Sequence, residues 1–213
     1  MKNIEGELAW RVLLIGGASG VGKTSVSYRI AHHYGVGITE IDDFQVILER
    51  LTTPEQEPVV HLWRTQPDAW HRMDEEGKLE HSVSYAEVMA RVLEPVIANH
   101  LESGNPIVLE GDFLLPTLAV KQSYDGIAAE GRVRALSLYE EDEHQISRNY
   151  AAREGEAQPE RARASWRYSE WLRKEAERVG VPAISARPWD TVLERAIAAV
   201  ERDSSPERPG SST

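Results

Sequence analysis

The sequence predicts an α/β fold with a central parallel sheet. Two observations support this prediction: short, continuous apolar runs alternate with longer stretches of helical periodicity, and glycine or proline closes most of these segments. Continuous apolar runs indicate strands that are buried on both faces, as in a sheet with helices on either side. A chain of 213 residues suits one compact domain, which we place at residues 1–201.

Short apolar runs predict strands at residues 12–15, 37–41, 106–111, 132–139 and 182–185. Apolar residues at helical spacing predict helices at residues 23–34, 85–101, around 168–179 and 190–200. Pro95 interrupts the second of these helices and should kink or split it.

Two segments do not follow the alternation. Residues 51–84 are polar, contain proline and have weak periodicity, so we expect an insertion with a functional role. Residues 202–213 form a polar tail rich in serine, proline and glycine, which we expect to be disordered.

Composition narrows the classes of function. A net charge of −11 argues against a nucleic-acid partner, because lysine and arginine drive binding to phosphate backbones. The arginines between residues 148 and 173 alternate with glutamates, which indicates ion pairs on solvated helix faces. No apolar run is long enough to span a membrane and no secretion signal is visible, so we expect a cytoplasmic protein. The absence of cysteine excludes disulfides, and the sequence leaves monomer and homodimer open.

One motif points directly to chemistry. A glycine-rich turn between the first strand and the first helix matches the pattern G-x-x-x-x-G-K-[ST]. The residues expected to bind nucleotide there are Gly17, Ala18, Ser19, Gly20, Val21, Gly22, Lys23, Thr24 and Ser25. Glycines let successive amides face phosphate oxygens, and the helix that follows adds free N–H groups. Lys23 is expected to contact the β- and γ-phosphates, and the Thr24 hydroxyl is expected to bind Mg²⁺. The sequence therefore predicts an ATP- or GTP-binding loop, called the P-loop below.

Acidic residues follow the second and third predicted strands, whose ends should converge on the same crevice. Asp42 is expected to accept a proton from an acceptor hydroxyl or to position Mg²⁺ through water. Asp43 is expected near the acceptor, although capping of the following helix fits it as well. Glu110 is the expected carboxylate beside Thr24 and the metal, and Asp112 is expected to contact the acceptor or the metal.

An arginine-bearing segment follows the fourth predicted strand. Arg148 and Arg153 are expected to neutralise charge on the transferring phosphate, provided that residues of about 140–160 act as a mobile lid. Each of these arginines also fits a surface ion pair.

These pieces together resemble the P-loop small-molecule kinases, which include the nucleoside monophosphate kinase-like folds, and most of all the 2-phosphoglycerate kinase-like proteins. The matching stretches are "IGGASGVGKTS", "ITEIDDF" and "VLEGDFLLP", and the resemblance covers most of residues 12–200. It implies a three-layer fold with a five-stranded parallel sheet and a helical lid, and ATP with Mg²⁺ as the donor. It also implies an adenine site near "SARPWD", which makes Arg187 and Trp189 candidates.

The acceptor site is the least defined part of the sequence, because residues 51–84 have no clear counterpart in that family. Arg64 and Arg72 would hold a carboxylate or phosphate, whereas Trp63 and Trp70 would favour an aromatic or sugar-bearing acceptor or simply cover the core. We expect an ATP-dependent kinase acting on a small-molecule hydroxyl, such as 2-phosphoglycerate or a related metabolite. A nucleoside or antibiotic phosphotransferase and a regulatory NTPase are the alternatives.

Overall fold

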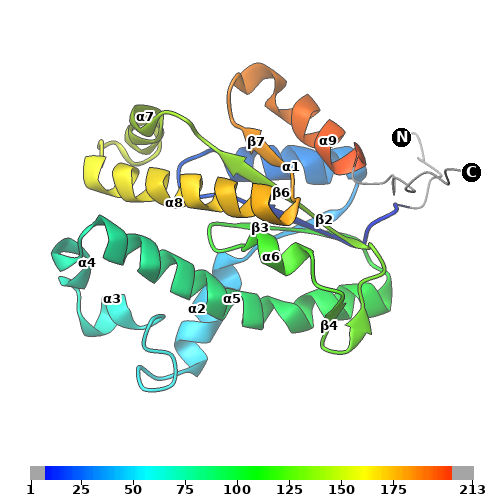
Figure 1. The fold of residues 1–213 in the computed structure, drawn as a ribbon, viewed down its shortest axis with the longest axis horizontal. Coiled ribbons are helices and arrows are strands. Elements are labelled where there is room, and N and C mark those ends of the chain that lie inside the picture. Colours follow the sequence, from blue (N-terminus) through cyan, green and yellow to red (C-terminus); the bar gives the residue numbers. More distant parts are fainter. Residues whose placement is uncertain (1–7, 203–213) are drawn as a thin grey trace, which may run out of the picture.

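The structure, a computed structural model, describes residues 8–202. At its centre lies a sheet of five parallel strands in the order β2–β3–β1–β6–β7 (Figure 1). The strands are β1 Val12–Gly16, β2 Gly37–Glu40, β3 Ile107–Gly111, β6 Val133–Tyr139 and β7 Ala183–Ser185. The predicted parallel sheet is confirmed, and every predicted strand agrees with an observed one to within one residue at each end.

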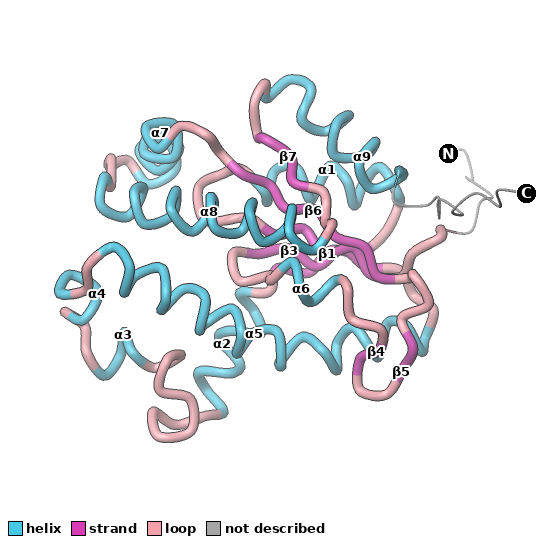
Figure 2. The backbone as a smooth tube through the Cα atoms, in the orientation of Figure 1, coloured by secondary structure: helices cyan, strands magenta, loops and turns pink. Residues whose placement is uncertain are grey.

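Helices occupy most of the connections between these strands (Figure 2). They are α1 Lys23–Tyr34, α2 Asp42–Leu51, α3 Leu62–Thr65, α4 Ala69–Arg72, α5 Glu75–Ser103, α6 Pro116–Ala119, α7 Glu143–Glu154, α8 Pro159–Val179, a 3₁₀ turn Trp189–Thr191 and α9 Val192–Arg202. A two-stranded antiparallel hairpin, β4 Ser123–Tyr124 with β5 Ile127–Ala128, was not expected from the sequence.

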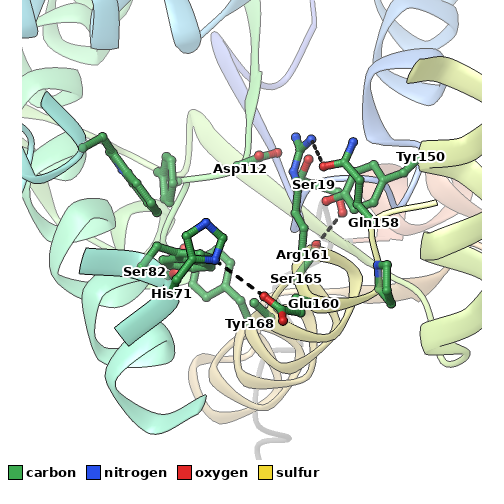
Figure 3. A pocket seen from close by; sticks show the side chains of 15 residues that line it. Ser19, His71, Ser82, Asp112, Tyr150, Gln158, Glu160, Arg161, Ser165 and Tyr168 are labelled. Atoms are coloured by element: carbon green, nitrogen blue, oxygen red, sulfur yellow. Dashed lines mark hydrogen bonds and ion pairs between the residues drawn. The ribbon is translucent and has the colours of Figure 1, made fainter. Parts of the chain in front are cut away.

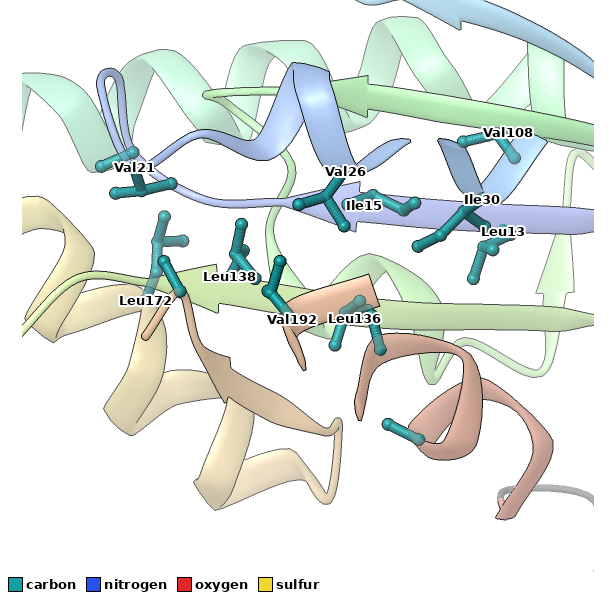
Figure 4. Packing of buried hydrophobic residues seen from close by; sticks show 14 of the residues in the cluster. Leu13, Ile15, Val21, Val26, Ile30, Val108, Leu136, Leu138, Leu172 and Val192 are labelled. Atoms are coloured by element: carbon teal, nitrogen blue, oxygen red, sulfur yellow. The ribbon is translucent and has the colours of Figure 1, made fainter. Parts of the chain in front are cut away.

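The sheet is buried on both faces, as its continuous apolar strands predict. Leu13 and Ile15 of β1 pack with residues of α1 and α9 on one face (Figure 4). Val12 and Leu14 alternate with them and pack with residues of α5 and α6 on the other face. Successive strand residues point to opposite faces, so a single strand supplies both cores. The result is a three-layer arrangement of helix, sheet and helix.

Two sequence-based expectations about helices are corrected. Helix α5 runs unbroken from Glu75 to Ser103, so Pro95 does not split it. The segment 51–84, in which the sequence predicts no helix, contains α3, α4 and the first ten residues of α5. At the other end of the chain, α9 extends to Arg202, and the remainder of the expected tail lies outside the described residues.

The topology brings several connections to one edge of the sheet. The P-loop follows β1, Asp42 follows β2, Glu110 ends β3, and α7 follows β6. Because all five strands are parallel, these carboxyl ends share the same edge, which is where α/β sheets of this type bind ligands. No helix in residues 8–202 has the length and apolar character needed to span a membrane.

Candidate active site

The P-loop requires glycine at two positions where side chains of neighbouring elements press against it. Gly20 has φ +79°, and a Cβ atom there would lie 2.9 Å from a methyl group of Ile146. Gly22 has φ +94°, and its Cβ would lie 2.7 Å from the Trp189 ring. Both positive φ values belong to the left-handed region that glycine adopts without strain. The loop is therefore shaped by the helix after β6 and by the turn after β7.

Side chains from α7 and α8 fix the loop's carbonyl groups. Asn149 Nδ2 donates a hydrogen bond of 2.7 Å to the Gly20 carbonyl, and Gln145 Nε2 donates to Asn149 Oδ1 at 2.8 Å. Ser165 Oγ donates to the Ser19 carbonyl at 2.5 Å. With its carbonyls turned toward α7 and α8, the loop leaves amide groups free for an anion.

Lys23 and Thr24, the first residues of α1, each contact an acid at the end of β3. The Lys23 ammonium forms an ion pair with Asp112, and the Thr24 hydroxyl donates a hydrogen bond of 3.0 Å to Glu110 Oε1. The second carboxylate oxygen of Glu110 is buried and has no hydrogen-bond partner among the described residues. Residues that the sequence separates by more than eighty positions thus form one cluster, because β1 and β3 are neighbours in the sheet.

Burial and mutual charge shift the pKa values in this cluster. Burial raises the pKa of Glu110 above its usual range, although Lys23 and the hydrogen bond from Thr24 oppose the shift. Burial would lower the pKa of Lys23, but Asp112, Glu110 and Asp42 together raise it, so the ammonium stays charged. The pKa of Asp42 is raised by partial desolvation of its carboxyl and by the neighbouring Asp112 charge. A site with this many carboxylates around one lysine is suited to a strongly positive or metal-bearing ligand.

The cluster fits a magnesium ion that is bound jointly by protein and phosphate. Within residues 8–202 no group of three or more histidine and acidic side chains is arranged to hold a metal by itself. Magnesium bound with a nucleotide needs only one or two protein ligands, with phosphates and water completing the octahedron. The Thr24 hydroxyl and the unpartnered oxygen of buried Glu110 provide oxygens of this kind.

Asp42 and Asp43 lie in the first turn of α2, and both residues are exposed. Helix α2 begins at Asp42 with Ile41 in the cap position and no capping side chain, so the capping role considered for Asp43 is wrong. Neither aspartate lines the two large cavities described next. Glu40, at the end of β2, does line the first of them, and it accepts a hydrogen bond of 2.8 Å from the Tyr28 hydroxyl.

The first cavity, of about 800 Å³, opens beside the P-loop. We call it the donor cavity. Its lining residues are Gly20, Gly22, Lys23, Thr24, Ser25, Glu40, Gln145, Asn149, Ala152, Arg153, Arg187 and Trp189. The structure thus brings Arg187 and Trp189, predicted from the last strand, to the same cavity as the P-loop. Arg187 also donates a hydrogen bond of 3.0 Å to the buried carboxylate of Glu140.

The two arginines expected in the lid have different surroundings. Arg153, near the end of α7, lines the donor cavity. Arg148 does not, because its guanidinium is held by Asp142 at 2.9 Å and by Gln145 at 2.7 Å on the surface of α7. The expectation that arginines in this region form surface ion pairs is met for Arg148, and also for Arg153, whose Nε donates a hydrogen bond of 3.0 Å to Glu154.

The second cavity, of about 690 Å³, reaches the P-loop at Ser19, and we call it the acceptor cavity (Figure 3). Its lining residues are Ser19, Trp63, Trp70, His71, Ser82, Asp112, Phe113, Tyr150, Gln158, Pro159, Glu160, Arg161, Ala164, Ser165 and Tyr168. One wall comes from α3, α4 and α5, the other from α8. Asp112, which lines this cavity, is ion-paired with Lys23, which lines the donor cavity.

The acceptor cavity departs from the sequence-based expectation in its charged residues. Arg64 and Arg72, proposed from the sequence to hold an anionic acceptor, are both exposed and do not line it. The reason is the orientation of the short helices α3 and α4, which turn Trp63 and Trp70 inward instead. Arg161, Phe113 and Tyr168 line the cavity but were not identified as site residues. In the sequence, Tyr168 is recognisable only as one of the apolar positions of a long helix.

Comparisons with known proteins bear on the fold and on the type of reaction. No protein-family model matches the chain. A crystal structure of a Thermus thermophilus protein has a TM-score of 0.56 over 92% of this chain and 99% of its own, at 17% identity. A sugar kinase from a Janibacter species has a TM-score of 0.51 over 90% of this chain and 95% of its own, at 19% identity. The chain has the fold of the P-loop small-molecule kinases.

Sequence relatives of this kinase fold are distant. The 2-phosphoglycerate kinase of Methanocaldococcus jannaschii is 30% identical over 117 residues, which cover 53% of this chain and 37% of that protein. Its counterpart in Methanopyrus kandleri is 25% identical, covering 88% and 59% of the two chains. The mevalonate-3-phosphate 5-kinase of Thermoplasma acidophilum is 28% identical over 51% of this chain and 54% of its own. The chain therefore spans less than two thirds of the curated relatives it matches.

Proposed function

We propose that the chain is an ATP-dependent kinase that transfers the γ-phosphoryl group to a hydroxyl of a small molecule. One observation carries the proposal: two large cavities meet at the Lys23–Asp112 ion pair, since Lys23 lines one of them and Asp112 lines the other. A nucleotide switch needs only the first cavity. A transferase needs both, because the donor and the acceptor must bind with their reacting atoms in contact.

The donor side follows from the P-loop geometry. Nucleotide phosphates would bind to the loop amides and to Lys23, which then exchanges Asp112 for a phosphate oxygen. Thr24 and Glu110 would hold Mg²⁺, which would offset the negative charge of the phosphates. Arg187 and Trp189 lie where the base would be expected, beside Gly22.

The acceptor side places a carboxylate at the junction. Released from Lys23, Asp112 would accept a hydrogen bond from the hydroxyl that is to be phosphorylated. The hydroxyl oxygen forms a bond to the γ-phosphorus as the bond from that phosphorus to the β–γ bridging oxygen breaks and ADP leaves. Asp42, whose pKa is raised by partial desolvation and by Asp112, is proposed to take the hydroxyl proton when the first turn of α2 moves toward the junction. Arg153 would neutralise charge on the transferring group from the donor cavity.

Two classes of acceptor are compatible with this reaction. The relatives' names point to phosphorylated hydroxy acids, such as 2-phosphoglycerate. The aromatic lining of the acceptor cavity favours a ring-bearing alcohol of the nucleoside or antibiotic type.

The proposal is tested by incubating the protein with γ-labelled ATP, Mg²⁺ and a panel of acceptors from both classes. Transfer of label to at least one acceptor is expected, and Lys23→Met should reduce it by at least about 100-fold. Calorimetry with a non-hydrolysable ATP analogue provides a measurement that is independent of turnover. Failure of the analogue to bind, or slow hydrolysis that no acceptor stimulates, would contradict the kinase proposal. The second result would favour a regulatory NTPase.

A further inference from the structure

Aromatic rings, among them Trp63, Trp70 and Phe113, form much of the wall of the acceptor cavity, and the buried rings of Tyr85 and His81 lie behind this lining. The rings of Trp63 and Trp70 have centroids 4.9 Å apart and stand at the outer end of the cavity. At the inner end, next to Asp112, Phe113 lies 4.5 Å from Tyr85 and 6.1 Å from Tyr168. His81 connects the two groups, with its ring centroid 5.5 Å from that of Trp63 and 6.3 Å from that of Tyr85. Such a wall offers a large face for a flat ring.

The charged groups that line the cavity do not provide a site for a strongly anionic acceptor. Its acids are Asp112 and Glu160, and its basic groups are Arg161 and His71. Arg161 Nη1 is already bonded to Glu154 at 2.9 Å, and its guanidinium lies 4.4 Å from the centre of the Tyr150 ring. His71 faces Glu160, with Nδ1 3.7 Å from the carboxylate.

This near balance of acidic and paired basic side chains disfavours a phosphorylated acid as the acceptor. Such a compound carries phosphate and carboxylate charges, and in the cavity it would meet the already paired Arg161 and His71 together with the carboxylates of Asp112 and Glu160. Carboxylates facing an anionic ligand oppose its binding. A neutral or cationic compound meets no such repulsion.

Two tyrosines that line the cavity carry neutral hydroxyls, which would serve a ligand once they turn toward it. The hydroxyls of Tyr150 and Tyr168 are buried and have no hydrogen-bond partner among residues 8–202. Burial and the nearby Asp112 charge raise the pKa of Tyr168 far above its usual value, so its hydroxyl keeps its proton. Buried polar groups in native proteins usually have partners, and orphaned ones at a cavity wall are typical of a site that a ligand completes.

We infer that the acceptor is an uncharged or cationic ring-bearing alcohol, of the nucleoside or cyclic amino-alcohol type, and not a phosphorylated acid. The inference rests on the proposed kinase function and specifies its acceptor. The ring would lie against Trp63 and Trp70, and the hydroxyl to be phosphorylated would face Asp112 at the junction with the donor cavity.

The test measures acceptor binding by calorimetry, with the donor cavity filled by a non-hydrolysable ATP analogue. The probes are thymidine, uridine and kanamycin on one side, and 2-phosphoglycerate and glycerate on the other. At least one ring-bearing probe is expected to bind at least about tenfold more tightly than either acid. Label transfer from ATP is expected to follow the same order.

Trp63→Ala provides a sharper test, because the Trp63 side chain is partly exposed and its loss should leave the fold intact. The variant should weaken binding of the ring-bearing probe by about tenfold without changing the affinity for the ATP analogue. Trp166→Ala is the matched control, since Trp166 lies on α8 outside the acceptor cavity, and acceptor binding should stay the same. Thermal unfolding of both variants verifies their folding.

The outcomes separate the two proposals. Tighter binding of 2-phosphoglycerate, absence of binding by every ring-bearing probe, or an equal effect of Trp63→Ala and Trp166→Ala would each overturn the acceptor class. Binding of a ring-bearing probe without any transfer of label would support the acceptor class and count against the kinase reaction. Absence of binding by the ATP analogue would also count against the kinase reaction alone, because probe binding can be measured without the analogue.

Discussion

The Thr24 hydroxyl donates a hydrogen bond of 3.0 Å to one oxygen of Glu110, while the other oxygen of this buried carboxylate has no partner among the described residues. An unpaired buried carboxylate oxygen costs free energy in the ligand-free protein. A metal ion placed between the two side chains would satisfy the oxygen and neutralise the charge. The pair therefore links the sequence motif to a specific dependence on magnesium.

Replacing Glu110 by glutamine should weaken that dependence without removing the P-loop. We expect Glu110→Gln to raise the Mg²⁺ concentration needed for half-maximal nucleotide binding by about 10-fold or more. Calorimetric titration of Mg²⁺ at a fixed nucleotide concentration measures this directly. Glu40→Gln is the matched control, because Glu40 lines the donor cavity together with Thr24 but already has Tyr28 as partner. An unchanged Mg²⁺ requirement in Glu110→Gln would remove Glu110 from the metal site.

The same carboxylate should make the stability of the ligand-free protein depend on pH. Burial raises the pKa of Glu110 above that of the unfolded chain, so the folded state binds this proton more tightly. The stability that comes from this tighter proton binding is fully present below the pKa of Glu110 in the unfolded chain. It is lost as the pH rises through the pKa of Glu110 in the folded protein. For every tenfold tightening of proton binding, the free energy of unfolding changes by about 1.4 kcal/mol, or roughly 3–6 °C in Tm for a domain of this size.

Glutamine at position 110 does not ionise, so the Tm of Glu110→Gln relative to the wild type should rise as the pH increases from about 5 through the raised pKa of Glu110. Differential scanning calorimetry without nucleotide or metal tests this expectation. A difference in Tm that stays constant over the range would show that burial does not change the proton affinity of this group.

Asp42 and Asp43 provide a matched pair for the proton-acceptor role. Both lie in the first turn of α2, but only Asp42 is electrostatically coupled to Lys23 in the cluster. We expect Asp42→Asn to lower kcat by about 10²–10⁴-fold with little change in ATP affinity, and Asp43→Asn to have a small effect. Steady-state kinetics with the acceptor found in the screen distinguish them. Near-normal turnover in Asp42→Asn would leave Asp112 as the sole carboxylate at the junction.

Arg148 and Arg153 should differ in their effect on transfer. Arg153 lines the donor cavity and is paired with Glu154, whereas Arg148 does not line it and is bound to Asp142 and Gln145. We expect Arg153→Ala to lower kcat by about 10²-fold or more and Arg148→Ala to lower it much less. Single-turnover kinetics separate this effect from product release. A larger loss of kcat in Arg148→Ala than in Arg153→Ala would mean that α7 rotates during the reaction and brings Arg148 to the donor cavity in place of Arg153.

Arg187 should contribute to stability as well as to the donor cavity. Its guanidinium is bonded at 3.0 Å to Glu140, whose side chain is almost fully buried. Arg187→Ala leaves this carboxylate unpaired and should destabilise the protein by about 1–3 kcal/mol, as measured by urea unfolding. Adding Glu140→Gln should recover most of the loss. Equal stability of Arg187→Ala and the wild type would show that water replaces the arginine without cost.

The strands and the P-loop were predictable because their signals are local. A strand such as β1 is buried on both faces and therefore reads as an uninterrupted apolar run. The loop motif depends on residues that are consecutive in the chain. The start of α5 was missed because its first turns are polar, although Asp74 caps the helix by accepting a hydrogen bond from the Gly77 amide. That capping residue, followed by two glutamates, was a signal available in the sequence.

The acceptor cavity could not be assembled from the sequence in the same way. Trp63 and Tyr168 are more than one hundred residues apart and lie on opposite walls, brought together by the packing of α5 against α8. Periodicity tells which side of a helix is apolar, but not whether that side meets the core or a cavity. It also cannot tell that Arg64 faces away from the cavity while Arg161, from the opposite wall, lines it.

The hydrogen bond from Ser165 to the Ser19 carbonyl joins the phosphate-binding loop to a helix that forms a wall of the second cavity. If the acceptor fixes the position of α8 when it binds, the hydrogen bond would also fix the P-loop that receives the nucleotide. Substrate affinities linked in this way are reciprocal, so each ligand should enhance the binding of its partner by the same factor. Such synergy would keep ATP from being consumed by water while the acceptor is absent.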